Sequence, residues 1–270
     1  MHIIKRIETS PGIFVNDITS FNQSPGDSDA RAHSNINNGI IYYTANNGDG
    51  NNEIYTLLTE SAYNRLLRPF MANEGSITSP IAKDTFYYGL KEDIITGSIP
   101  SNPDNFLTLS NGETILKAQA RPDHNGYELF VIRFEFGQLV RIDFNPAGKG
   151  SNPSKFIQIP RSPSRALFSA EVNRTTESPP DRELYRTTGN SPVLLKNINE
   201  KQDESSNPDN FVVYNERIYF SANDGIHGNE IWVTDGNELG EGTNLFMDLN
   251  PGLDGSDFKK GIVNIGKLYF

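Results

Sequence analysis

Residues Ser206 to Gly236 read SNPDNFVVYNERIYFSANDGIHGNEIWVTDG. Apolar residues alternate with polar ones in three short runs, 211–214, 217–222 and 230–234, and Asn, Asp, Gly and Pro separate these runs. Such a pattern predicts three half-buried antiparallel strands joined by turns. Other parts of the chain repeat this stretch, so the fold can be predicted from it.

The aromatic run of the middle strand, Ile218-Tyr219-Phe220, has counterparts along the whole chain. These runs end at residues 43, 88, 116, 168, 220 and 270, and the step from 88 to 116 is short. Six copies in 270 residues average 45 residues each, which is the size of a four-stranded propeller blade. A further strand opens each unit, for example at 245–248. The repeat therefore predicts blades of four short strands.

The two ends of the sequence indicate how the blades are arranged. The last copy stops after its third strand, and residues 2–7 form a strand without a unit of its own. We therefore predict an all-β, six-bladed β-propeller with four-stranded antiparallel blades, in which the N-terminal strand completes the last blade and closes the ring. The propeller forms a single domain, residues 1–270. Its expected blades span approximately 11–58, 64–97, 98–133, 137–188, 190–236, and 243–270 with 1–10.

One part of the repeat resembles a known family. Residues Glu230 to Gly236, preceded by Phe220 to Gly225 and His227-Gly228, are similar to the ELWxxDGT repeat family of bacterial proteins. The resemblance is strong over 190–270, moderate over 139–189 and faint before that, and Asn237 stands where the family has Thr. It implies a repeat-built bacterial protein that is often secreted or surface-associated, and it implies no established reaction.

Composition limits the classes of partner and location. The net charge is −10, from 24 Lys plus Arg against 34 Asp plus Glu, which argues against a nucleic-acid groove or an anionic membrane surface. No apolar run is long enough to span a bilayer, and cysteine is absent, which excludes disulfides and thiolate sites. The family resemblance implies an extracellular or cell-surface location. Because the first twelve residues lack a signal-peptide core, we expect the segment to be mature or exported by another route.

Acidic residues recur at the ends of the opening strands. The candidate metal ligands are Asp17, Asp143, Asn197 and Asp248, while Pro69 takes that place in another blade. If these strands line a central channel, a ring of oxygens could hold calcium, which takes six to eight oxygen ligands. Alternatively, each Asp caps the turn that follows it.

Aromatic residues recur at one position of the strand that closes each unit: Tyr55, Tyr185 and Trp232. They could stack on sugars between blades, or they could pack adjacent blades together. Glutamates begin the same strand at 53, 128, 183 and 230, and we expect each to bond a neighbouring blade or loop. The Gly-rich loops, such as 223–228, are interpreted as left-handed turns because they lack the spacing of a calcium loop.

The function most consistent with these features is a non-enzymatic binding or scaffolding propeller. Its ligand, a carbohydrate or a protein, would sit on one face of the ring or between blades. One alternative is a metal-dependent hydrolase or lactonase with its cation in the channel. Another is a structural subunit that self-assembles into a homo-oligomer through its flat faces. No catalytic residue is nominated by spacing.

Overall fold

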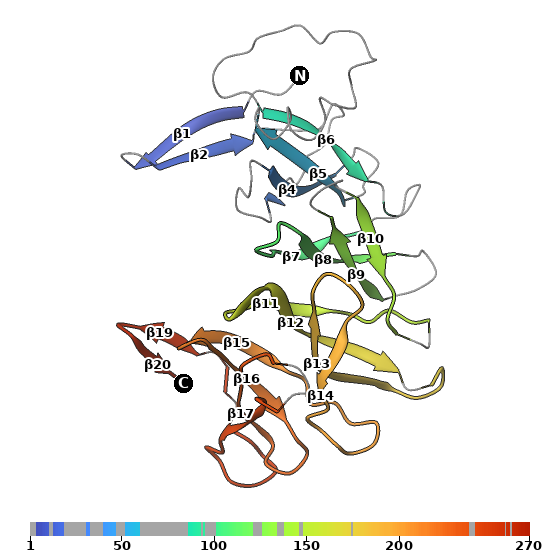
Figure 1. Cartoon of the computed structure of the whole chain (residues 1–270), viewed down its shortest axis with the longest axis vertical. Helices are drawn as coiled ribbons and strands as arrows, with labels where there is room; N and C mark the ends of the chain where they lie inside the picture. The colour runs from blue at the N-terminus through green and yellow to red at the C-terminus, as the bar shows by residue number, and fades with distance from the viewer. Residues whose placement is uncertain are drawn as a thin grey trace, which may run out of the picture. The chain divides into compact units, whose positions relative to one another are not determined.

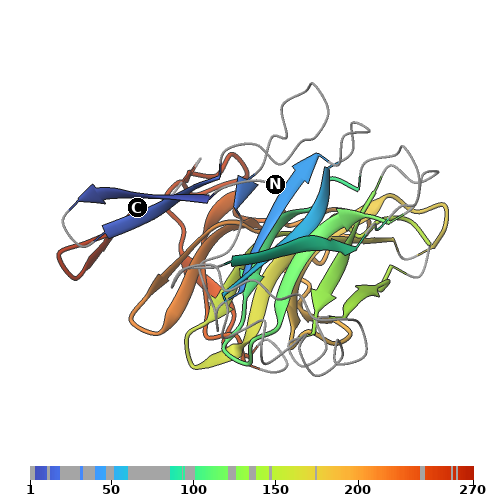
Figure 2. The ribbon, with the colours of Figure 1, turned by 90° about the horizontal axis from the view of Figure 1, so that it is seen from above.

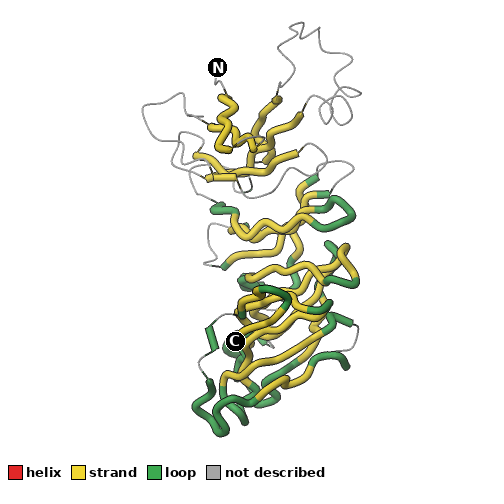
Figure 3. Tube along the Cα trace, turned by 90° about the vertical axis from the view of Figure 1, so that its left-hand side faces the viewer, coloured by secondary structure: helices red, strands yellow, loops and turns green. Residues whose placement is uncertain are grey.

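The computed structural model describes residues 4–10, 13–18, 31–32, 40–46, 52–59, 86–92, 94, 101–120, 126–133, 138–145, 148–173, 175–237, 241–256, 258–259 and 261–270. Every regular element within them is a β-strand, and Figure 3 shows strands and loops without helices. None of these residues belongs to a helix that could cross a membrane. The chain divides into two compact units, Met1–Asp104 and Asn105–Phe270, which are described separately.

The first unit contains a hairpin and a four-stranded sheet. Strand β1 pairs antiparallel with β2, and the sheet has the order β3-β4-β5-β6. Their bounds are β1 Ile4–Ser10, β2 Ile13–Ile18, β3 Arg31–Ala32, β4 Ile40–Asn46, β5 Asn52–Thr59 and β6 Phe86–Glu92.

The second unit contains three four-stranded antiparallel sheets and a hairpin, in the order of the chain. The first two sheets are formed by β7 Asp104–Thr108 (which starts at the boundary of the units), β8 Thr114–Gln119, β9 Tyr127–Ile132 and β10 Leu139–Ile142, and by β11 Ser154–Ile159, β12 Ser162–Asn173, β13 Pro180–Thr187 and β14 Val193–Lys196. The third sheet and the hairpin are formed by β15 Asp209–Tyr214, β16 Arg217–Asn223, β17 Asn229–Thr234 and β18 Asn244–Met247, and by β19 Ile262–Asn264 and β20 Lys267–Tyr269.

Hydrophobic cores lie between successive sheets of the second unit. Figures 1 and 2 show these sheets one after another along the chain. The middle strands, such as β16 and β17, are almost continuously buried because both of their faces are covered. Leu184, Leu195 and Ile198 of one sheet pack with Phe220 and Trp232 of the next. The described part of the chain is therefore all-β, with repeated four-stranded antiparallel sheets, as predicted.

One predicted middle strand lies at the edge of a sheet instead. The aromatic run 86–88 is not a separate middle strand, since β6 pairs with β5 at the edge of the sheet that contains β4. The described residues form four sheets of four strands and two hairpins, so the number of blades stays a prediction. An aromatic strand alternates in the same way at an edge as in the middle of a sheet, so the pattern alone does not separate the two positions.

The sheets are also shifted by one strand relative to the units marked out in the sequence. The strand expected to open a unit, for example β18, pairs with β17 of the preceding unit and closes that sheet. Loop length explains the shift: residues 188–192 join β13 to β14 as a hairpin, whereas the longer segment 197–208 crosses to β15. Within their units, β1 pairs with β2 and β20 pairs with β19, so the closed ring stays a prediction.

Candidate functional site

A buried glutamate at the start of the third strand of each sheet binds the segment that leads to the next sheet. Glu183 accepts hydrogen bonds from the backbone N–H groups of Ile198, Asn199 and Ser206 and from the Ser206 hydroxyl. Burial raises the pKa of Glu183 to about 7, against the lowering effect of these hydrogen bonds. The carboxyl group therefore fixes both ends of the crossing segment.

The other glutamates repeat this arrangement, which we call the glutamate clamp, at both ends of the crossing segment for Glu53 and at one end for Glu128 and Glu230. Glu53 accepts hydrogen bonds from Ile94 and Ser101. Glu230 accepts them from Leu249 and Asn250, and Glu128 accepts one from the Ser151 hydroxyl. The expectation that these glutamates bond a neighbouring loop is confirmed.

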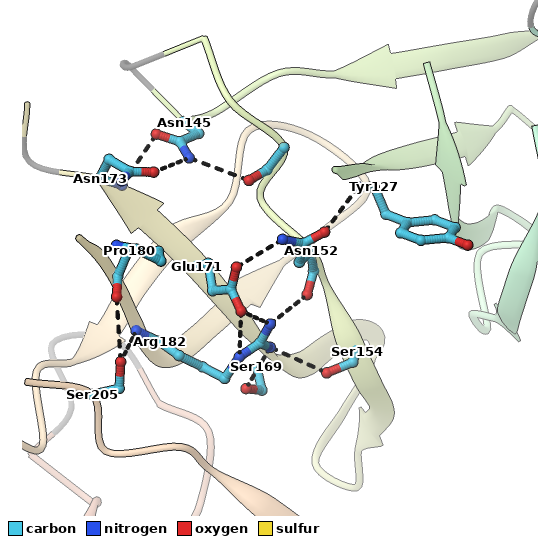
Figure 4. A network of polar contacts seen from close by, with 11 residues as sticks. Tyr127, Asn145, Asn152, Ser154, Ser169, Glu171, Asn173, Pro180, Arg182 and Ser205 are labelled. Atoms are coloured by element: carbon cyan, nitrogen blue, oxygen red, sulfur yellow. Dashed lines mark hydrogen bonds and ion pairs between the residues drawn. The ribbon is translucent and has the colours of Figure 1, made fainter. Parts of the chain in front are cut away.

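The Ser-Asn-Pro sequences that receive the clamp share a strained backbone. Asn102, Asn152 and Asn207 have φ of 44°, 43° and 48°. Asparagine tolerates this left-handed region better than most residues. The arch at 151–153 is held further by polar contacts (Figure 4): Asn152 accepts from the Tyr127 N–H and donates to Glu171, to which Arg182 also donates. These contacts fix where the first strand of the next sheet begins.

The candidate metal ligands occupy equivalent places in three sheets. Asp143, Asn197 and Asp248 each follow the last strand, because the residues before them pair with Leu129, Leu184 and Ile231 in one common register. The equivalent residue after β6 is Asp93, not Pro69; both lie outside the described residues, as does the side chain of Asp17 in β2.

The acids follow the last strand of each sheet, whereas the first strands contact one another, β11 with β15 and β15 with β19. The metal site stays a prediction. Asp143 pairs with Arg141. In the described part of the chain, no group of three His, Asp or Glu side chains is placed to hold a metal ion.

Two of these residues, Asn197 and Asp248, also do not cap the turn that follows them. Asn197 Oδ1 and Asp248 Oδ1 are buried and accept no hydrogen bond from described residues. The turn N–H groups that follow them bond to Glu183 and Glu230 of the adjacent strand instead. The clamp glutamates, and not Asn197 or Asp248, therefore cap these two turns.

The candidate aromatic ligands are core residues where they are described. Tyr185 and Trp232 are 8% and 6% exposed, and each packs in the core between two sheets. Their position in the third strand turns them toward the neighbouring sheet. Packing between sheets, the alternative to sugar stacking, thus describes both, and the side chain of Tyr55 lies outside the described residues.

The Gly-rich loop 223–228 is a turn with left-handed glycines, as interpreted from the sequence. Gly225 and Gly228 have φ of 76° and 73°. Asp224 accepts hydrogen bonds from the N–H groups of Ile226 and His227, and its other oxygen contacts His227 Nδ1 at 2.7 Å. The Asp224 carboxylate raises the pKa of His227. These contacts satisfy the loop internally.

A pocket that the sequence analysis missed opens between the first strands of two neighbouring sheets. It has a volume of about 310 Å³. Its lining residues come from the starts of β11 and β15: Lys155, Phe156, Ile157, Asp209, Asn210 and Phe211. Lys155 Nζ lies 3.1 Å from Asp209 Oδ1, and the two side chains are 54% and 43% exposed. The pocket therefore combines a solvent-exposed ion pair with two aromatic side chains.

These features define a class: an all-β protein of repeated four-stranded sheets with an open pocket between first strands. The sequence matches no protein-family model and no curated protein. Among solved structures, the chain is similar to Zg3597, a family 117 glycoside hydrolase produced by the marine bacterium Zobellia galactanivorans. The TM-score is 0.37 with 12% sequence identity, over 93% of this chain and 77% of that chain.

Proposed function

We propose that this protein is a non-enzymatic binding module, extracellular or surface-associated, whose small polar ligand docks in the pocket between β11 and β15. The observation that carries the proposal is the pocket itself, which presents Lys155, Asp209 and two phenylalanines at one place. Concave sites with a few polar groups among aromatic side chains are typical of ligand binding.

The framework around the pocket supports this proposal because it holds the lining residues before a ligand arrives. The Glu128 and Glu183 clamps hold Ser151 and Ser206, each three residues before a pocket strand begins. Phe156 packs on Phe168 and Phe211 packs on Phe220. A preorganised site loses less conformational entropy on binding.

A closed propeller ring, as predicted from the sequence, is part of the proposal. The hairpin β19–β20 repeats the first two strands of a sheet, and β1–β2 would supply the last two. The cysteine-free chain allows a direct test with spin labels on Lys5→Cys in β1 and Lys267→Cys in β20. Closure predicts one short distance, because adjacent strands lie about 5 Å apart. A long or broad distribution would exclude the ring.

Binding can be tested on the full chain by ligand-observed NMR against neutral glycosides, uronates, amino acids and short peptides. The variant Lys155→Ala/Asp209→Ala should lose the ligand. The matched control is Arg161→Ala/Glu216→Ala, which removes an exposed ion pair between turns of the same two sheets, outside the residues that line the pocket. A ligand that binds both variants equally, or that the protein converts chemically, would contradict the proposed function.

A further inference from the structure

Lys155 is an exception to the repeat at the rim of the pocket. The fifth residue of each Ser-Asn-Pro arch has a left-handed backbone, with φ of 54° at Asn105, 61° at Lys155 and 58° at Asn210. Asparagine adopts this conformation readily, but for lysine it is unfavourable because Cβ approaches the following carbonyl oxygen. Strained backbone of this kind clusters at functional sites. The exception therefore points to a functional role for the lysine in the pocket.

The ion pair at this rim leaves hydrogen-bonding groups for a ligand. An ammonium group has three donors, and Asp209 Oδ1 is the one contact of Lys155 Nζ among the described residues. Asp209 Oδ1 also accepts from the Asn210 N–H, while Oδ2 has no partner in the described part of the chain. The pocket thus offers two N–H donors next to one carboxylate acceptor.

The charges of the pair cancel, which favours a neutral ligand. An anion would meet the Asp209 carboxylate in a chain of net charge −10, and a cation would meet the Lys155 ammonium. A neutral group that both donates and accepts satisfies the two partners without leaving a charge unpaired. Two adjacent hydroxyl groups have this capacity.

The aromatic walls add a requirement for an apolar surface on the ligand. The rings of Phe156 and Phe211 are half-buried, each with its centroid 5.4 Å from that of a core phenylalanine, Phe168 or Phe220. Both residues also line the pocket. A sugar ring presents C–H groups on its faces and hydroxyl groups around its edge, so it can contact a phenyl ring and the ion pair together.

We infer that the pocket recognises a neutral saccharide through two adjacent hydroxyl groups that bridge Lys155 and Asp209. This inference rests on the proposed binding function and makes Lys155 the residue that determines ligand class. It accounts for a lysine at a position where the other arches have asparagine: the amino group provides binding and offsets the backbone strain.

The test compares methyl hexosides, their 2-deoxy and 3-deoxy analogues, the corresponding uronates and phenylalanine, all titrated into the full chain. Lys155→Asn should weaken binding of the hexosides about tenfold or more, the loss of one good hydrogen bond. The same variant should raise the midpoint of thermal unfolding by about 2 °C, because it relieves strain. A purely structural lysine would not show these opposite changes.

Two further measurements sharpen the test. A deoxy analogue that lacks one bridging hydroxyl should bind about tenfold more weakly than its parent. Asp209→Asn should weaken hexoside binding and strengthen uronate binding, since it leaves the Lys155 charge unpaired, while the control Arg161→Ala/Glu216→Ala should change neither.

The outcomes separate the inference from the proposed function. Preference of the wild-type pocket for uronates or phenylalanine, or unchanged hexoside affinity in Lys155→Asn, overturns the inference and leaves the binding function standing. Absence of binding by every probe, including the peptides, counts against both.

Discussion

The two edges of each sheet in the second unit differ in what they contact. The first strands β11 and β15 approach each other and form the pocket. The last strands β14 and β18 expose apolar residues, including Val193, Leu194 and Phe246, and end at the polar residues Asn197 and Asp248. The more conspicuous sequence pattern lies at the last-strand edge, whereas the pocket lies at the first-strand edge. A recurring residue type therefore marks what the repeat needs structurally, and a departure from the repeat marks the proposed site.

The largest effect is expected from Glu183, whose clamp holds the segment that runs from the last strand of one sheet to the first strand of the next. Glu183→Ala should lower the free energy of unfolding by about 4 kcal/mol, because it leaves several buried donors without an acceptor. Urea denaturation of the variant measures this, with the exposed Glu177→Ala as control. A loss below about 1 kcal/mol would show that the clamp contributes little to the free energy of unfolding.

The same carboxyl group should make stability depend on pH. The folded pKa of Glu183, about 7, lies above the usual value of 4.5 for a glutamate. Its contribution to stability is therefore fully present below pH 4.5 and is lost as the pH rises through 7. The loss amounts to about 3 kcal/mol. Denaturation at pH 4.5 and pH 8 should show this fall in the wild type and a smaller fall in Glu183→Gln. Identical pH profiles would contradict it.

Two adjacent residues of β14, the last strand of its sheet, test whether only the buried face of this strand contributes to the core. Leu195 is 4% exposed and packs against the next sheet, whereas Leu194 is 48% exposed. Leu195→Ala should cost about 2 kcal/mol and Leu194→Ala less than about 0.5 kcal/mol. Equal losses of stability in the two variants would mean that the exposed face of β14 is covered by another part of the protein or by a partner.

Calcium should have the smallest effect. Asp143, Asn197 and Asp248 follow the last strands of three different sheets, so calcium added after EDTA treatment should shift the thermal midpoint by less than about 1 °C. A shift of several degrees would instead support a metal site at these residues and favour the metal-dependent hydrolase.

Sequence reasoning succeeded where the structure follows local alternation and failed where it depends on neighbours. The strands around Phe220 and the role of Glu183 were predictable because each repeats in phase. The place of Phe86 to Tyr88 was predicted wrongly, because this run has the composition of a middle strand but pairs at an edge. The pocket joins residues 155 and 209, which are brought together only by the approach of two sheets. Alignment of SNPSK with SNPDN could have singled out Lys155 as the residue that departs from the pattern.

The glutamate clamp has a consequence for how such chains change in length. The clamps of Glu53, Glu128 and Glu183 each take the carboxyl group from one sheet and a serine from the segment before the next sheet, 23 residues later in the case of Glu183 and Ser206. A duplicated sheet brings one of each, so its own glutamate meets the following serine and its serine meets the preceding glutamate. Gene duplication or deletion of a whole sheet thus leaves no buried carboxyl group without partners, and the number of sheets can drift during evolution while every joint stays intact.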